Sequence, residues 1–202
     1  MRRIRAGIVY GEIAPGTIHS APALAARLGV SVTPVREALI ALSYRGMVTQ
    51  VRNRGFRVVE HSHTELDAAL ELRLLLELPM LTRFASGFDP AEAPQLRALV
   101  DDGLQAARAA DFSGFLDLDR RFHLGLLALA GNSRVVEIVD QVLDQLRLGA
   151  FRQPGDGAPL VTVASGHGDI LDAVQAGDPA AVERAVRAHL DLTRTAWAAR
   201  EG

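Results

Sequence analysis

The chain of 202 residues contains no cysteine and no lysine, and it has no long apolar run. The absence of cysteine excludes disulfide bonds and thiolate ligands for a metal. No apolar segment reaches the roughly 18 residues that a membrane-spanning helix needs. The first residues lack the long apolar stretch and the cleavage site of a secretory signal. We therefore expect no membrane segment, and we attach no function to the use of arginine for all 22 basic residues.

Charge is divided unevenly along the chain. Hydrophobic residues make up 49% of the sequence, which is enough for a packed core. Residues 1–60 hold nine arginines against the three acids Glu12, Glu37 and Glu60, whereas residues 61–202 hold 13 arginines against 21 acids. A locally positive segment in a mildly acidic protein is typical of polyanion binding. The first third is therefore the candidate for contact with nucleic acid.

The pattern of residues 1–60 predicts a winged helix-turn-helix. A short helix is expected over residues 4–10, and a second helix is capped by Ser20 and ended by Gly29. A third helix, capped by Ser31 or Thr33, carries apolar residues at spacings of four and three (Val35, Leu39, Leu42). Residues 48–51 and 56–59 then resemble two short strands joined by a turn.

The remainder, residues 64–202, predicts an antiparallel six-helix bundle. Its alanine- and leucine-rich segments are interrupted by turn residues such as Asp89-Pro90, Asp111, Gly131-Asn132 and Gly177-Asp178-Pro179. The expected helices span residues 64–87, 90–110, 112–130, 133–150, 160–176 and 179–200, with a break at residues 154–157. We place the boundary between the two domains at residues 61–63. Since helices are expected over most of the chain, the predicted fold class is mainly α.

The second helix of a helix-turn-helix enters the major groove of double-stranded DNA, with its N-terminal residues near the base edges. Arg36 lies in the first turn of that helix, outside the apolar stripe, so it is free to reach guanine or phosphate. The hydroxyls of the helix start and the cationic wing tip suit the DNA backbone or the minor groove. The predicted DNA-binding residues are Ser31, Thr33, Arg36, Arg52, Asn53, Arg54 and Gly55. The alternative is a solvated surface on a protein-binding winged helix.

Four residues of the bundle have the types and the spacing of one metal site. Asp119 and His123 are four apart and share a helix face. His167 lies ten residues before Gly177 and His189 twelve after it, so two antiparallel helices bring them to the same level. Imidazoles with one carboxylate suit Zn²⁺, Ni²⁺, Mn²⁺ or Fe²⁺. The alternative is a set of ordinary helical histidines, with Asp119 and His123 as a simple pair on one helix face.

The N-terminal motifs resemble the GntR family of bacterial regulators. They are Pro15-Gly16, LAARLGVS at 24–31, TPVREAL at 33–39 and L-x-x-x-G-M-V at 42–48, followed by a wing with a glycine at its tip. The resemblance implies that Arg36 and the wing contact operator DNA. Two features depart from the family: Val32 replaces a usual DNA-contacting arginine, and the first helix is short, as in a truncated chain or one with a misassigned start. We expect weaker DNA contact from both.

The later motifs resemble the FCD effector domain, which defines the FadR-type branch of that family. They are D-x-x-F-H at 119–123, A-G-N at 130–132, H-x-x-I-x-x-A-x-x-x-G-D at 167–178 and His189. The six-helix count is similar to the VanR-like group. The resemblance implies that Asp119, His123, His167 and His189 hold a divalent metal. It also implies a small organic acid as effector, with Arg73 as a cavity residue.

We therefore expect a cytoplasmic, homodimeric, ligand-responsive transcription regulator that binds a roughly palindromic operator. It is not expected to be an enzyme. The first alternative is a metal-dependent enzyme in which the Asp/His₃ site activates water, although the sequence shows no separate general base. The second is a structural DNA-binding dimer whose bundle holds no ligand.

Overall fold

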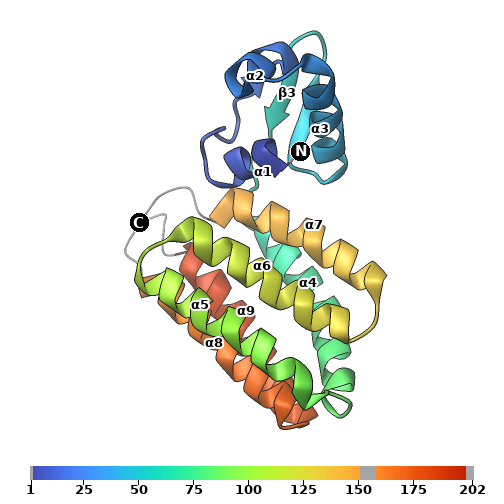
Figure 1. Cartoon of the computed structure of the whole chain (residues 1–202), viewed down its shortest axis with the longest axis vertical. Helices are drawn as coiled ribbons and strands as arrows, with labels where there is room; N and C mark the ends of the chain where they lie inside the picture. The colour runs from blue at the N-terminus through green and yellow to red at the C-terminus, as the bar shows by residue number, and fades with distance from the viewer. Residues whose placement is uncertain (1, 151–157, 199–202) are drawn as a thin grey trace. The chain divides into compact units, whose positions relative to one another are not determined.

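The computed structural model describes residues 2–150 and 158–198, which form two compact units (Figure 1). The first unit runs from the N-terminus to Leu66 and includes the last turns of helix α7 from Leu143 onward. The second unit holds the other described residues. Helices make up most of both units, so the mainly α class predicted from the sequence is confirmed.

The first unit is a winged helix-turn-helix. Its elements are α1 (Arg2–Val9), β1 (Ile18–His19), α2 (Ala21–Leu28), α3 (Val32–Tyr44), β2 (Val48–Val51) and β3 (Gly55–Val58). The strands form an antiparallel sheet in the order β1-β3-β2. The sequence predicted the β2–β3 hairpin but not β1. A two-residue strand has no periodicity of its own, and β1 exists because Ile18 and His19 pair with Arg57 and Phe56.

Local capping sets the ends of the helix-turn-helix. The Ser20 hydroxyl accepts a hydrogen bond from the Ala23 amide at 3.2 Å, which fixes the start of α2. Gly29 ends α2 with φ +68°, a left-handed conformation that favours glycine. Ser31 occupies the cap position of α3, but its side chain makes no capping hydrogen bond. Leu24 of α2 and Leu39 of α3 are both buried in the core of the unit.

The six helices predicted after residue 63 are present in the predicted order, and most of their residues belong to the second unit. They are α4 (His63–Ala85), α5 (Ala93–Arg108), α6 (Phe112–Leu129), α7 (Ser133–Ala150), α8 (Ala158–Gln175) and α9 (Pro179–Ala198). Residues 90–92 form a short 3₁₀ turn (η1, Pro90–Glu92) where the start of α5 was expected, and Asp89 caps the Ala91 amide of this turn. The predicted break at residues 154–157 and the end of the last helix at 199–200 lie outside the described residues.

The packing of four helices forms the part of the bundle that matters for the site. Helix α5 packs against α6 and α8, and α8 packs against α9. Helices α8 and α9 form the hairpin predicted from the turn at Gly177, whose φ is +64°. None of the described helices is long and apolar enough to span a membrane.

A buried carboxylate joins α7 to the helix-turn-helix within the first unit. Asp144 has no exposed side-chain surface. It accepts hydrogen bonds from Arg5 Nε at 2.8 Å and from Arg45 Nε at 2.7 Å. Two guanidinium groups thus surround one buried carboxylate and match its charge. Sequence reasoning did not predict the cluster, since its members lie 99 and 139 residues apart.

Candidate functional site

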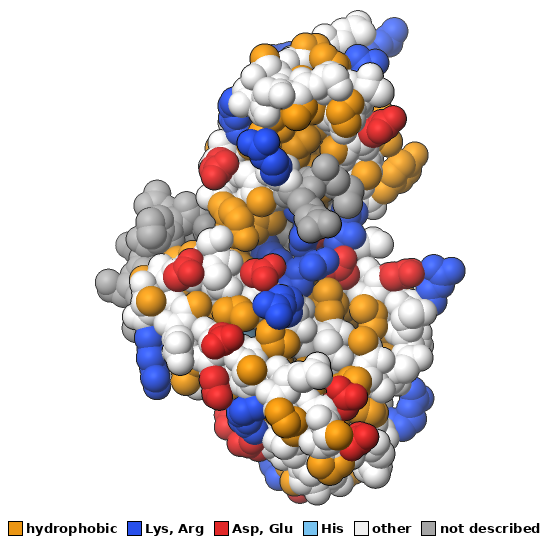
Figure 2. Space-filling view, in the orientation of Figure 1, with side chains coloured by type: hydrophobic (Ala, Val, Ile, Leu, Met, Phe, Trp, Pro, Cys, Tyr) orange, Lys and Arg blue, Asp and Glu red, His pale blue; other side chains and the backbone are white. Residues whose placement is uncertain are grey.

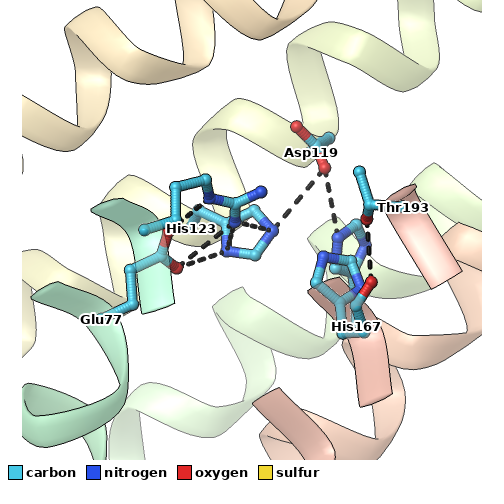
Figure 3. Close-up of polar contacts among 7 residues, drawn as sticks. Glu77, Asp119, His123, His167 and Thr193 are labelled. Carbon is cyan, nitrogen blue, oxygen red and sulfur yellow. Dashed lines mark hydrogen bonds and ion pairs between the residues drawn. The ribbon is translucent and has the colours of Figure 1, made fainter. Parts of the chain in front are cut away.

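The structure brings together the four predicted metal ligands in the second unit (Figure 3). Asp119 and His123 lie one turn apart on α6, His167 lies on α8 and His189 on α9. One ligand atom from each of the four lies within 4.8 Å of every other. The three imidazole rings have centroid separations of 4.6 to 5.1 Å and are buried. Three helices therefore supply one compact set of nitrogen and oxygen donors.

Several donor atoms of this cluster have no hydrogen bond, which fits a site built for a cation. His167 Nε2 lies 3.2 Å from Asp119 Oδ1, and His123 Nε2 lies 3.7 Å from the same oxygen. Nε2 of His167 and both ring nitrogens of His189 are buried without a hydrogen-bond partner among the described residues. Buried polar atoms are normally satisfied. Three histidines and one carboxylate are also the donor types that transition metals prefer.

Burial keeps these imidazoles in the form that binds metals. Desolvation lowers the pKa of His123, and the Arg73 guanidinium lowers it further. Desolvation also lowers the pKa of His189 well below its usual value, with added repulsion from the neighbouring histidines. Only neutral imidazole ligates a metal. Both rings are thus neutral at pH 7, and no proton has to leave them when a cation binds.

A glycine allows α8 to approach the cluster. A Cβ atom built on Gly166 would lie 3.0 Å from Nδ1 and 3.4 Å from Cβ of His189, which is tighter than ordinary contact. At Gly168, on the other side of His167, the nearest atoms are 3.9 Å away. An alanine at position 166 would therefore displace the His189 ring by a few tenths of an ångström, whereas an alanine at position 168 would meet only ordinary contacts.

Arg73, the predicted effector residue, lies in the middle of α4 and is paired. Its Nε is 2.5 Å from Glu77 Oε1, and both side chains are 2% exposed. Burial alone would raise the pKa of Glu77, but the Arg73 guanidinium and the hydrogen bonds from His123 and Arg73 lower it to about 2. Sequence reasoning missed Glu77. Its only signal was the spacing of four from Arg73, which is also common on solvated helix faces.

The predicted DNA-binding residues lie at two places of the first unit. Ser31, Thr33 and Arg36 are exposed at the start of α3. Arg52, Asn53 and Arg54 form the turn between β2 and β3, and Gly55 is the first residue of β3. Figure 2 shows basic side chains and a few acidic ones on the visible face of the first unit, and acidic and basic side chains interspersed over that of the second.

Backbone geometry explains two residues of the wing. Asn53 adopts φ +59°, and Gly55 adopts φ +122°, a conformation that side chains rarely tolerate. A Cβ atom on Gly55 would lie 2.3 Å from the carbonyl oxygen of His19 in β1. Gly55 thus has a structural requirement that is independent of DNA: it lets β3 approach the backbone beside β1. Arg52 and Arg54 are presented on either side of the left-handed Asn53.

Comparison with known families identifies both units. Residues 1–58 match the family described as bacterial regulatory proteins, gntR family, and residues 67–192 match the FCD domain. The two matches follow each other along the chain and cover most of it. The chain therefore belongs to the GntR family of transcription regulators and carries an FCD domain, as its sequence motifs predicted.

Individual relatives are regulators too. The chain is 36% identical over 194 residues to an HTH-type transcriptional regulator in an unstable DNA locus of Streptomyces ambofaciens, with 93% of this chain and 79% of the relative covered. It is 30% identical over 192 residues to the HTH-type transcriptional repressor RspR of Escherichia coli, with 94% and 83% covered. These relatives are transcription regulators rather than enzymes.

Solved structures share the fold. The structure of E. coli McbR/YncC has a TM-score of 0.87 at 21% identity and covers 100% of this chain and 96% of its own. A GntR regulator from Rhodococcus has a TM-score of 0.81 at 24% identity, with the same coverage. At this level of identity the likeness concerns the arrangement of helices and strands.

Proposed function

We propose that the chain is a homodimeric regulator that binds operator DNA through residues 1–60 and responds to a divalent metal and a small carboxylate bound by residues 64–202. The observation that carries the proposal is the convergence of Asp119, His123, His167 and His189 within 4.8 Å inside the FCD match. A regulator that carries such a cluster and a DNA-binding unit in one chain has the two sites that ligand control requires. We expect it to act in the cytoplasm.

The DNA-binding half rests on exposure and charge. Arg36 would reach base edges or phosphate from the first turn of α3, and Ser31 and Thr33 would donate hydroxyl hydrogens to the same backbone. Arg52 and Arg54, beside Asn53 and Gly55, would contact the backbone or the minor groove from the wing. Val32, half-buried at the start of α3, offers no hydrogen bond where the family usually has arginine. We therefore expect binding that relies on phosphate contacts and weakens steeply with salt.

The effector half rests on the donor set. Asp119 and the three histidines would hold Zn²⁺, Ni²⁺, Mn²⁺ or Fe²⁺, and a metal with open coordination positions would accept a carboxylate oxygen from an organic acid. The ring centroids of Phe115 and Phe122 lie 6.3 and 4.8 Å from that of His167. Apolar rings therefore surround this ligand. Arg73 would assist an effector carboxylate only by exchanging its present partner, Glu77.

The homodimer is supported by an exposed apolar stripe on α4. Leu72 and Leu75 are 39% and 63% exposed, and Pro79 continues the same face one turn later. Exposed apolar residues on one helix face suit contact with another protein surface. We assign it to a second copy of this chain, because a palindromic operator requires a two-fold protein.

Analytical ultracentrifugation tests this: Leu75→Glu should yield monomers, whereas Arg108→Glu on α5 should leave a dimer. A monomeric wild-type chain contradicts the proposal.

Selection of bound DNA from a random pool, with and without chelator, tests the whole proposal. We expect an enriched, roughly palindromic sequence whose recovery depends on metal. A gel-shift titration on that sequence then compares candidate organic acids. Enrichment of no sequence would contradict the DNA-binding proposal. Enrichment that neither chelator nor any acid alters would contradict ligand control.

A further inference from the structure

A buried ion pair on α4 lies against the candidate metal cluster, and none of the four ligands belongs to it. Arg73 and Glu77 are joined by Nε–Oε1 at 2.5 Å and by Nη2–Oε2 at 3.3 Å. Both side chains are 2% exposed. Removing two charges from water is costly, and a buried pair often contributes no more stability than apolar side chains of the same size. Folding stability therefore gives no sufficient reason for this pair.

The pair contacts one ligand, His123, on the side away from Asp119. Glu77 Oε2 lies 3.1 Å from Nδ1 of His123, whereas the other ring nitrogen, Nε2, lies 3.7 Å from Asp119 Oδ1 (Figure 3). An ionised carboxylate only accepts hydrogen bonds. Nδ1 is the ring nitrogen beside this acceptor, so we infer that it carries the hydrogen donated to Glu77, which in the neutral ring leaves the lone pair on Nε2. Nε2 lies toward Asp119, and Arg73 Nη2, which can only donate, lies 3.0 Å from the same nitrogen.

Arg73 would oppose a cation if it stood alone. Its Nη2 lies 3.0 Å from both ring nitrogens of His123, so its positive charge is next to a metal ligand. The negative charge of Glu77 balances it at hydrogen-bond distance. The pair thus presents a hydrogen-bond acceptor to His123 without adding net charge to the site.

We propose that Glu77 is a positioning residue for the metal centre. It holds His123 in the Nδ1–H tautomer, turns Nε2 toward the metal, and neutralises Arg73. Partners that orient a ligating histidine in this way commonly change metal affinity by about 10- to 100-fold when they are replaced. The inference rests on the metal-binding part of the proposed function and assigns Glu77 a role in it.

The test measures Zn²⁺ affinity of the full chain by competition with a chromophoric chelator, after metal has been removed. Glu77→Gln should lower the affinity by about 10- to 100-fold. Glu71→Gln, an exposed glutamate on the same helix, is the matched control and should bind as the wild type does. Circular dichroism of the metal-free variants checks that each is folded. A folded Glu77→Gln variant with wild-type affinity overturns the proposal.

A second variant separates the two effects of Glu77. The double substitution Arg73→Gln with Glu77→Gln removes the opposing charge as well, so it should bind Zn²⁺ more tightly than Glu77→Gln alone. Equal affinity of the two variants overturns the neutralising role.

A measurement on the unaltered protein needs no variant to fold. Nitrogen-15 NMR of histidine-labelled, metal-free chain should show His123 as the Nδ1–H tautomer, and an Nε2–H tautomer overturns the proposal. If the chain has no metal site at all, the wild type should bind Zn²⁺ no more tightly than a His123→Ala variant. This result differs from the one expected if only the role of Glu77 is wrong.

Discussion

Alanine at position 166 would test whether the close approach of α8 to His189 matters for metal binding. The new Cβ atom would lie 3.0 Å from Nδ1 of His189 and 3.4 Å from its Cβ, so the ring would have to move by a few tenths of an ångström. Gly168 provides the matched control on the same helix. An alanine Cβ there meets only Arg97 and Val100, both at 3.9 Å.

The expected magnitudes follow from these distances. Glycine in a helix interior is about 0.8–1.0 kcal/mol less favourable than alanine. Gly168→Ala should therefore stabilise the metal-free chain by an amount of that order, whereas contact with His189 should cancel most of the gain in Gly166→Ala. Metal sites tolerate about 0.2 Å of error in ligand distance. A shift of a few tenths of an ångström should lower Zn²⁺ affinity about tenfold, or ~1.4 kcal/mol.

Two assays decide the matter. Urea unfolding of the metal-free variants gives the stability difference, and chelator competition gives the Zn²⁺ affinity. The reasoning is refuted if Gly166→Ala binds Zn²⁺ as tightly as Gly168→Ala and is stabilised to the same extent. That result would mean that a Cβ atom at position 166 does not displace the ring of His189.

The remaining predictions concern DNA affinity, the first unit and pH. Arg36→Ala should weaken operator binding by about 1–3 kcal/mol in a gel shift, and Arg108→Ala, on α5, should not; equal binding by both would remove Arg36 from the interface. Asp144→Asn should cost about 2–4 kcal/mol in urea unfolding, because two guanidinium groups lose a buried counter-charge; a loss under ~0.5 kcal/mol would contradict this. In metal-free chain, the pKa values of His123 and His189 lie below that of the unfolded state, near 6.5, so stability should be constant above that pH and fall as the pH drops below it. Unfolding measured at pH 5 and pH 7 checks the sign, which would be reversed if the rings were charged in the fold.

Much of the fold was predictable because its signals are local. Ser20 and Gly29 mark the ends of α2 through hydrogen bonds and a backbone angle that involve only neighbouring residues. The turn at Gly177 likewise separates α8 from α9. The 3₁₀ turn at residues 90–92 was missed because the Asp89-Pro90 signal is the same for a 3₁₀ and an α-helical start.

The sequence also predicted the residue types of the four candidate ligands. It further predicted that His167 and His189 lie at the same height along the α8–α9 hairpin. Helical rise and a single turn are enough to bring two side chains of a hairpin to one height. The sequence motifs similarly placed the chain in its family, since residues at fixed spacing carry that information without any structure.

The tertiary structure alone decided which residues surround those ligands. Glu77 meets His123 across 46 residues, and Asp144 meets Arg5 across 139. The close contact between position 166 and His189 appears only when α9 is packed beside α8. Such contacts depend on how whole helices pack, which no short-range pattern encodes. The sequence by itself thus determined the helices, the family and the donor types, and packing determined how one histidine is oriented and how its surroundings are charged.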